Sequence, residues 1–500
     1  MRMQKLAIEY LQNTQKILPN KIAIIDDGQC ITFRELWTRS LTLAYWINTK
    51  FQITNQPISI NLPKSIEAII ALLAIQMSGN IYVPLDIDAP ASRKNKILNT
   101  LDSNRTLEYS SGHFNLSGAI FSSSSESLAA VESSVLGKLS TRKTNDPLYI
   151  IFTSGTTGTP KGVTLSNASV IDYINWVIDT YSITDSEVIG NQAPLFFDNS
   201  VLDLYLTFAQ GCTLHLLSKN ALRFPADFEN YISTHQINFI FFVPSLLSNL
   251  VSLKVFKNHN LSCLKKILFA GEAMPLNALK QLKSSLPSTL FSNLYGPTEI
   301  TVDAIYWIFP NNIDLLNEVP LGKPCARHQV LFLDDNDRLV TAPDRTAEIC
   351  IAGPGVALGY WNNSQATDEV FIFNPEPGKE DEIIYKTGDL GYISSKDGLI
   401  YMTGRKDNQF KHYGYRIEAG EIENSLNQLD FILQSCVLYD AEKKRIHAFY
   451  TSSHSQTLPA LRNLLSPLLP QYMIPHSFHR LEKFPMTPNG KIDRLAIKSI

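Results

Sequence analysis

A dense set of glycine, hydroxyl and lysine side chains follows one apolar run of the chain. The run 148–152 leads directly into the segment 153–162, which contains three glycines, four threonines, one serine and one lysine. Glycines let the backbone approach an anion closely, hydroxyl and N–H groups donate hydrogen bonds, and lysine supplies positive charge. The spacing differs from G-x-x-x-x-G-K-[ST], because Lys161 is followed by Gly162. We expect this segment to bind a phosphate group, with an ordinary flexible turn as the alternative.

The cysteines do not form a pattern that points to metal or redox chemistry. The six cysteines are Cys30, Cys212, Cys263, Cys325, Cys350 and Cys436. No two of them have C-x-x-C spacing, so the sequence predicts neither a zinc ribbon nor a redox dithiol. We expect them to be buried as small hydrophobic residues.

The elements that must position the loop follow an alternating pattern. The run 58–62 is typical of a strand, the segment 65–77 is typical of a helix, and 239–243 is a further apolar run. Such alternation favours an α/β architecture with parallel sheets. The pattern changes to a charged, glycine-punctuated stretch near Asp407, so we expect an N-terminal domain over 1–406 and a smaller one over 407–500.

Composition excludes several classes of protein. Five hundred residues correspond to about three packed units. The 44 Lys and Arg against 47 Asp and Glu give a net charge of −3, which provides no bulk basic field for a nucleic acid. No run of 18 apolar residues is present, and the N-terminus has the pattern of an amphipathic helix rather than a signal peptide. We expect a cytoplasmic protein with neither membrane nor nucleic acid as a partner.

The segment 153–162 resembles the signature loop of the adenylate-forming enzymes, which include nonribosomal peptide synthetase adenylation domains, acyl-CoA synthetases and luciferases. Stretches similar to the other motifs of that family follow in order, at 31–36, 79–86, 293–299, 348–360, 385–390, 404–423, 469–475 and 489–494. The resemblance implies an α/β fold, with two β/α sheets plus a distorted β-barrel in the large N-terminal domain. A small, mobile α+β C-terminal domain would follow it.

The resemblance also implies a reaction and its catalytic residues. A carboxylate attacks the α-phosphate of ATP and expels pyrophosphate, so two anions must be held together by positioned positive charge. Lys491 matches the lysine that bridges the substrate carboxylate and the nucleotide. Glu299 matches the Mg²⁺ ligand, which suits a hard cation beside phosphates, and Thr298 precedes it. The implied cofactors are ATP and Mg²⁺.

The nucleotide-binding residues implied by the resemblance come from several motifs. Tyr295 would lie against adenine, Asp389 would accept both ribose hydroxyls, and Arg405 would assist at the ribose. The remaining expected contacts are Thr153, Ser154, Gly155, Thr156, Thr157, Lys161, Gly271, Glu272, Ala273, Asn293, Leu294, Gly296 and Tyr401. Two positions depart from the family: Met402 stands where an aromatic is usual, and Asn167 where a histidine is frequent.

Asp198 favours an amino acid as the substrate. Amino-acid-activating members have an aspartate at this position, which pairs with the substrate ammonium, and a buried carboxylate needs such a partner. The alternative is that Asp198 caps a helix. The family's pocket positions fall on Asp198, Asn199, Leu202, Phe242, Leu268, Ala270, Leu294, Val302, Asp303 and Lys491.

The apolar members of this pocket are similar to those of enzymes that activate L-proline for pyrrole and related alkaloid pathways. Asn199 and Asp303 depart from that pattern, and an acidic residue at the latter position also occurs with basic substrates. L-proline is the favoured substrate. D-alanine, another small or basic amino acid, and an acyl- or aryl-CoA ligase reaction are alternatives, as is a non-enzymatic nucleotide-binding relative.

The second half-reaction implied by the resemblance needs a partner. Because six residues follow Arg494, we expect a free-standing ligase that meets the phosphopantetheine thiol of a separate carrier protein. The C-terminal domain would rotate about a hinge at Asp407. One orientation would insert Lys491, and the other would present the loop at Gly414 to the thiol.

Overall fold

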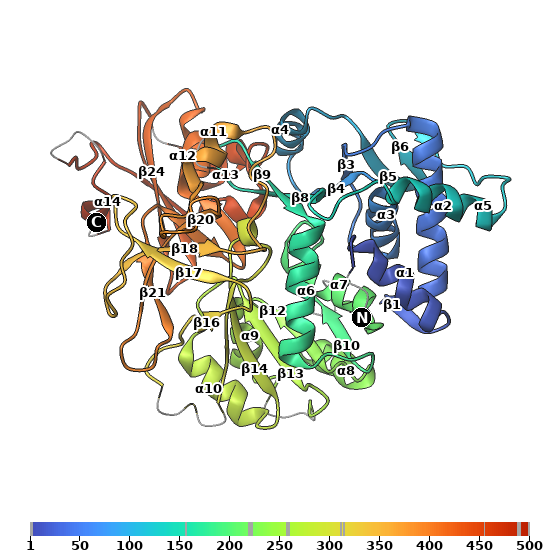
Figure 1. Cartoon of the computed structure of the whole chain (residues 1–500). Helices are drawn as coiled ribbons and strands as arrows, with labels where there is room; N and C mark the ends of the chain where they lie inside the picture. The colour runs from blue at the N-terminus through green and yellow to red at the C-terminus, as the bar shows by residue number, and fades with distance from the viewer. Residues whose placement is uncertain are drawn as a thin grey trace. The chain divides into compact units, whose positions relative to one another are not determined.

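The computed structural model describes the chain except for residues 1–3, 156–157, 219–223, 257–260, 311–312, 314–315, 455, 488–491 and 499–500. Helices and strands alternate along it, as Figure 1 shows. The chain divides into two compact units. The first unit comprises Met1–Leu85, Ser103–Ile151 and Val163–Gly404, and the second comprises Asp86–Asp102, Phe152–Gly162 and Arg405–Ile500. The expected α/β class, with a large N-terminal part and a small C-terminal part, is confirmed.

The largest sheet of the first unit has nine strands. Their order is β16 (Lys323–Pro324), β15 (Ile305–Ile308), β14 (Leu290–Tyr295), β13 (Lys266–Ala270), β12 (Phe239–Phe242), β10 (Val188–Asn191), β11 (Thr213–Leu216), β1 (Ile22–Asp26) and β2 (Gln29–Thr32). The run from β14 to β1 is parallel, and the outer strands are antiparallel. The central strands are apolar on both faces, as expected of a parallel sheet covered by helices on each side.

A seven-stranded sheet carries the segment before the predicted phosphate loop. Its order is β7 (Ala119–Ile120), β6 (His113–Leu116), β5 (Thr106–Ser110), β3 (Pro57–Ile60), β4 (Ile81–Pro84), β8 (Pro147–Thr153) and β9 (Lys161–Ser166). The predicted strand at 58–62 is confirmed as β3, and the apolar run 148–152 lies in β8.

A third sheet is antiparallel and has five strands, where the resemblance led us to expect a distorted β-barrel. Four strands run in the order β17 (Gln329–Leu333), β18 (Ala347–Ala352), β20 (Ile383–Ile393) and β19 (Phe371–Phe373), and β21 (Ile400–Arg405) pairs with β20.

Helices cover the sheets of the first unit. They are α1 (Ile8–Ile17), α2 (Phe33–Phe51), α3 (Ile66–Met77), α5 (Leu128–Leu139), α6 (Asn167–Tyr181), α7 (Asn199–Gln210), α8 (Pro225–Thr234), α9 (Pro244–Ser252), α10 (Leu276–Ser285), the short 3₁₀ helix η1 (Thr298–Ile300) and α11 (Ser364–Val370). The predicted helix at 65–77 is confirmed as α3. The Ser65 Oγ caps its N-terminus by accepting a hydrogen bond of 3.2 Å from the Ala68 N–H, and almost every side chain is buried.

The second unit has its own core. It contains α4 (Ala91–Leu101), the hairpin β22 (Gln409–His412) and β23 (Tyr415–Glu418), α12 (Ala419–Asn427), the three-stranded sheet of β24 (Ile432–Asp440), β25 (Arg445–Ser452) and β26 (Ser477–Arg480), α13 (Leu458–Leu465), η2 (Gln471–Met473) and α14 (Arg494–Ile497). Apolar residues of α12, α13, β24 and β25 form a single cluster. Across the part of the chain that the structure describes, no helix is both long and apolar enough to cross a membrane.

Candidate active site

The residues expected at the site fall into three groups. The expected adenine, ribose, magnesium and amino-acid contacts lie in the first unit, and the phosphate loop, Arg405, Asp407 and Gly414 lie in the second. Thr156, Thr157 and Lys491 lie outside the described residues. We therefore describe each part by itself.

The position expected to bind the ribose is built from two motifs of the first unit. The Tyr295 hydroxyl, at the end of β14, donates a hydrogen bond of 2.5 Å to Oδ2 of Asp389 in β20. The Thr387 hydroxyl accepts a bond of 3.0 Å from the Asp389 N–H and donates one of 2.7 Å to the Ile349 carbonyl. The Glu348 carboxylate accepts a bond of 2.9 Å from the Gly388 N–H, beside a register shift between β18 and β20. The residues of the 385–390 motif thus hold a buried carboxylate in a fixed place.

Glu299 is almost completely buried, with 1% of its surface exposed. It lies in η1, and its Oε1 accepts a hydrogen bond of 2.9 Å from the Tyr360 hydroxyl. Among the described residues, no group of three or more His, Cys, Asp or Glu side chains could hold a metal ion. A single carboxylate fits Mg²⁺, because that cation takes most of its ligands from water and substrate phosphates. Glu299 can thus hold Mg²⁺ beside a nucleotide, and cannot form a closed protein cage for it.

Three of the expected nucleotide contacts have structural partners of their own. Glu272 lies after β13, and its Oε2 accepts a hydrogen bond of 3.0 Å from the Ser245 N–H in the first turn of α9. Asn293 donates a bond of 2.8 Å to the Pro320 carbonyl. Tyr401 stacks on Tyr392, and its hydroxyl donates a bond of 2.8 Å to Asp397. Glu272 lies in the connection after β13, flanked by Gly271 and Ala273, whereas Asn293 lies in β14 and Tyr401 in β21.

Asp198 immediately precedes α7. It makes no side-chain hydrogen bond to cap that helix, so the helix-cap alternative is wrong. Burial raises the pKa of the Tyr149 phenol, and the charge of Asp198 raises it further, so Tyr149 lies within electrostatic reach of the carboxylate. The buried Nδ2 atom of Asn199 has no hydrogen-bond partner among the described residues. At the N-terminal end of α7, the carboxylate of Asp198 and the amide N–H donor of Asn199 are therefore on adjacent residues.

Most of the predicted apolar pocket residues share one core cluster. Those that do are Leu202, Leu268, Ala270, Leu294 and Val302. Ala270 and Leu294 are direct neighbours in the pairing of β13 with β14, so their side chains lie on one face of the sheet. The same face is covered by α6, because its Tyr181 hydroxyl bonds Ser292 of β14 at 2.8 Å.

The prediction for Phe242 is wrong. Its side chain belongs to the core cluster on the opposite face of the nine-stranded sheet, together with Phe269 and Ile240. Phe241 instead shares the cluster of Leu268 and is its direct neighbour in the pairing of β12 with β13. Successive side chains of a strand point to opposite faces, so one step along the chain exchanges the two positions. Both strands are apolar on both faces, so the sequence carried no signal that distinguishes Phe241 from Phe242.

Asp303 lies at the end of an unusual turn. Thr301 and Val302 have φ values of +61° and +68°, which are rare for β-branched residues. The Asp303 N–H donates a hydrogen bond of 2.9 Å to the Thr301 carbonyl, which closes a three-residue turn around Val302. Tyr173 of α6 donates a bond of 2.8 Å to the Asp303 carboxylate. Sequence reasoning missed Tyr173, because it lies in a helix that carries no motif.

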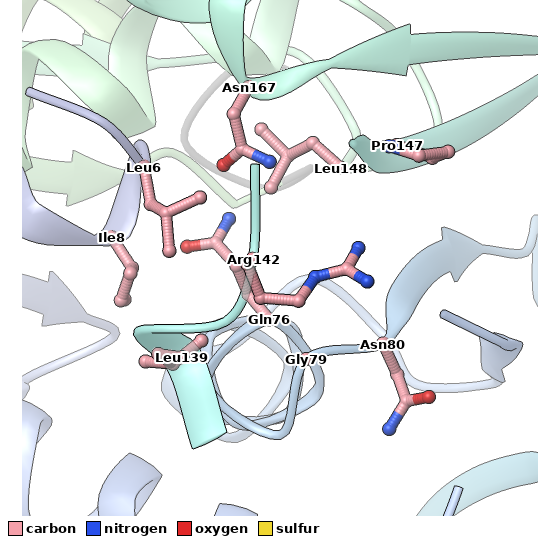
Figure 2. Close-up of a pocket in the computed structure, with 10 residues that line it drawn as sticks. All are labelled: Leu6, Ile8, Gln76, Gly79, Asn80, Leu139, Arg142, Pro147, Leu148 and Asn167. Atoms are coloured by element: carbon pink, nitrogen blue, oxygen red, sulfur yellow. The ribbon is translucent and has the colours of Figure 1, made fainter. Parts of the chain in front are cut away.

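Asn167 stands where the family frequently has a histidine, and its side chain makes two hydrogen bonds within the protein. Its Oδ1 accepts a hydrogen bond of 3.1 Å from the Ala7 N–H, and its Nδ2 donates one of 3.1 Å to the Asp146 carbonyl. It also lines a pocket that contains none of the residues predicted for nucleotide or substrate, as Figure 2 shows. The pocket is lined by Leu6, Ile8, Gln76, Gly79, Asn80, Leu139, Arg142, Pro147, Leu148 and Asn167.

The phosphate-loop segment lies in the second unit. A Cβ atom added to Gly155 would be 2.1 Å from the Thr159 carbonyl oxygen, so the loop closes only around a glycine. The Ser154 hydroxyl, which follows Thr153, donates a hydrogen bond of 2.8 Å to the Arg416 carbonyl. Lys96 donates one of 3.0 Å to the Gly158 carbonyl, and Lys161 begins β9. The backbone at Gly155 therefore lies close to the Thr159 carbonyl.

The predicted hinge and thiol-side residues also lie in the second unit. Arg405 donates two hydrogen bonds of 2.7 Å to the two carboxylate oxygens of Asp407. Burial raises the pKa of Asp407, but the hydrogen bonds and charge of Arg405 outweigh it and hold that pKa below its usual value. Tyr413 and Gly414 have φ values of +50° and +82° and form the two-residue turn between β22 and β23.

Comparisons with known proteins agree with this arrangement. A family model described as AMP-binding enzyme matches residues 11–361. The chain is 30% identical to the D-alanine–D-alanyl carrier protein ligase of Bacillus licheniformis, over 98% of each. It is 32% identical to tyrocidine synthase 1 of Brevibacillus parabrevis over 98% of this chain, and it spans 44% of that longer protein.

A solved structure has the same fold. The adenylation domain AlmE of Vibrio cholerae, determined with glycyl-adenosine-5'-phosphate, superposes with a TM-score of 0.84. The two share 19% identity, over 100% of this chain and 98% of the other. With the Tyr295–Asp389 pair and the buried Glu299 already described, these matches identify the chain: it belongs to the family of AMP-binding enzymes and has the fold of an adenylation domain.

Proposed function

We propose that the chain activates an amino acid as its aminoacyl adenylate and transfers it to the phosphopantetheine thiol of a separate carrier protein, with L-proline as the favoured substrate. The observation that carries the proposal is the placement of Leu268, Ala270 and Leu294 on one face of the paired strands β13 and β14, in the unit that holds Asp198. A small apolar ring suits those walls, and its ring nitrogen still needs a carboxylate partner. The D-alanine and tyrocidine relatives support the amino-acid class.

The first half-reaction joins two anions. The amino-acid carboxylate attacks the α-phosphorus of ATP, a new C–O–P linkage forms, and the bond to pyrophosphate breaks. In the proposal Asp198 holds the ammonium, Asp389 holds the ribose hydroxyls and Lys491 offsets the charge of the reacting groups. Mg²⁺, held by Glu299, would neutralise the charge that develops on pyrophosphate.

The second half-reaction breaks the acyl–phosphate bond. The carrier thiol, as its thiolate, attacks the acyl carbon, the thioester forms and AMP leaves. The turn at Tyr413 and Gly414 would face the thiol after rotation about Asp407. We propose that both steps take place in the cytoplasm, where ATP is supplied.

Amino-acid-dependent ATP–pyrophosphate exchange tests the first step. The panel would contain the proteinogenic amino acids, D-alanine and L-ornithine, with the Asp198→Asn variant as a control. We expect the strongest exchange with L-proline and a loss of at least tenfold in the variant. No exchange with any amino acid would contradict the proposal and favour an acyl-CoA ligase or a non-catalytic nucleotide-binding protein. The strongest exchange with D-alanine or with another amino acid would retain the amino-acid class and replace L-proline.

A hinge variant tests the second step. Proline at position 407 would fix φ and remove the flexibility that rotation needs. We expect Asp407→Pro to slow aminoacyl transfer at least tenfold while exchange stays within twofold of wild type. Equal loss of both activities would contradict the hinge. Asp407→Ala, which removes the same carboxylate and leaves the backbone free, is the matched control.

A further inference from the structure

The carboxylate of Asp303 is bound from inside the protein. Asp303 is 1% exposed and Tyr173 is 2% exposed. The Tyr173 hydroxyl donates a hydrogen bond of 2.8 Å to Oδ2 of Asp303, from a position 130 residues earlier in the chain. Since burying a carboxylate is costly, such a charge-assisted bond stabilises it where it lies.

The backbone fixes the direction in which Asp303 points. The turn at Val302 closes with the hydrogen bond from the Asp303 N–H, and the Ala304 N–H donates one of 2.9 Å to the Tyr295 carbonyl. Gly296 packs against this turn so closely that an added Cβ would lie 2.6 Å from the Asp303 Cα. The positive φ values of Thr301 and Val302 are unfavourable for β-branched residues, so the fold holds this turn against a local preference.

The phenol of Tyr173 stays a neutral donor. Burial raises its pKa well above the usual value, and the charge of Asp303 and the hydrogen bond raise it further. Burial and then the charge of Asp303 likewise raise the pKa of the neighbouring Cys325 thiol. The groups that surround the carboxylate from inside are therefore protonated and uncharged.

We propose that Tyr173 is a specificity-determining positioning residue, which holds the Asp303 carboxylate within the protein so that the pocket selects an uncharged amino-acid side chain. The inference rests on the proposed amino-acid function and deepens it. An acidic pocket residue would otherwise favour a cationic side chain, because the substrate ammonium would stabilise the buried carboxylate. Here the Tyr173 hydroxyl from α6 provides part of the stabilisation that a substrate ammonium would otherwise give to the carboxylate.

The test compares exchange kinetics with L-proline and L-ornithine in Tyr173→Phe. Removing the hydroxyl takes one charge-assisted hydrogen bond from the Asp303 carboxylate, and the ornithine ammonium can replace it. We expect the ratio of kcat/KM for ornithine to that for proline to rise at least tenfold, chiefly through a lower KM for ornithine. The double variant Tyr173→Phe with Asp303→Asn should return to the wild-type ratio, because the charge that attracts the ammonium is gone.

Tyr181→Phe is the matched control. Tyr181 is also buried in α6, and its hydroxyl bonds the neutral Ser292 at 2.8 Å, so its loss costs a similar hydrogen bond without touching a carboxylate. Its selectivity ratio should stay within twofold of wild type. An unchanged ratio in Tyr173→Phe, an equal change in Tyr181→Phe, or a wild type that already prefers ornithine would overturn the inference.

Two further results distinguish a change in selectivity from a failure to fold and from a failure of the proposed function. If Tyr173→Phe does not fold, the selectivity ratio of Asp303→Asn decides: a ratio of kcat/KM for ornithine to that for proline within threefold of wild type supports the inference, because the carboxylate is already held by Tyr173 and does not select for a cation. A fall of more than tenfold in that ratio would show that the carboxylate binds the substrate cation, and overturns it. A wild type that exchanges with no amino acid overturns the proposed function as well, which distinguishes that failure from an unchanged ratio.

Discussion

The Tyr295 hydroxyl and the Asp389 carboxylate, 94 residues apart in the chain, are joined by a hydrogen bond of 2.5 Å. The bond links the end of β14 to β20, and so connects two different sheets of the first unit. The carboxylate expected at the ribose is thus held in place by the aromatic residue expected at adenine. Binding of a nucleotide then needs little rearrangement, which lowers its cost.

Asp389→Asn should weaken nucleotide binding. The amide keeps an acceptor for Tyr295, but it loses the charge and one of the two acceptor oxygens for the ribose hydroxyls. We expect the KM for ATP in the exchange assay to rise about tenfold, equivalent to about 1.4 kcal/mol. Asp381→Asn, at an exposed site, should leave the KM unchanged. A KM for ATP within twofold of wild type would exclude a ribose role for Asp389.

Glu299→Gln should reduce exchange by at least a hundredfold. The amide retains an acceptor for the Tyr360 hydroxyl but is a poor ligand for Mg²⁺. Tyr360→Phe removes the same hydrogen bond and keeps the carboxylate, so it should lose far less activity. The dependence of exchange on Mg²⁺ concentration checks the cause, because the glutamine variant should need more of the cation. Equal losses in the two variants would mean that the hydrogen bond, rather than the charge, matters.

Gly296→Ala should distort the turn that carries Val302 and Asp303. The added Cβ would lie 2.3 Å from the Val302 carbonyl oxygen, so the backbone must move. We expect a lower thermal midpoint and a higher KM for the amino acid. Gly137→Ala is the control, since an added Cβ meets nothing within 4 Å in α5 and alanine favours a helix. Thermal melting and exchange kinetics measure both, and a wild-type KM in Gly296→Ala would show that the turn does not shape the pocket.

Stability should depend on the protonation of Asp203 in α7. This carboxyl is fully buried, and burial raises its pKa to about 7, although Asn191 donates a hydrogen bond of 2.8 Å to it and Lys64 is close by. Between pH 4 and 7 the folded chain therefore binds a proton more tightly than the unfolded chain does. The free energy of unfolding should fall as the pH rises through this window, by up to about 1.4 kcal/mol per pH unit.

Asp203→Asn should remove that dependence. Thermal midpoints at pH 5, 6 and 7 measure the slope in wild type and variant. Asp368→Asn, at an exposed site of α11, should retain the wild-type slope. The same slope in Asp203→Asn as in wild type would mean that other groups set the pH dependence.

Local patterns determined much of what this chain is. The glycine-rich segment after β8, the apolar strands and the α3 helix follow from residue type and spacing over short distances, because backbone freedom and side-chain periodicity act within a few residues. The motifs also predicted Asp389 and Glu299, which the structure holds in defined, buried environments.

The tertiary structure alone decided which distant side chains meet. Whether Phe241 or Phe242 shares the face of Leu268 depends on the register between β12 and β13. The contact between Tyr173 and Asp303 depends on how α6 packs against the sheet, and Asn167 bonds the chain near α1 for the same kind of reason. Such contacts form because packing brings together residues that are not neighbours in the chain, such as Tyr173 and Asp303 at a separation of 130 positions, and no short-range pattern in the sequence encodes which of them pair.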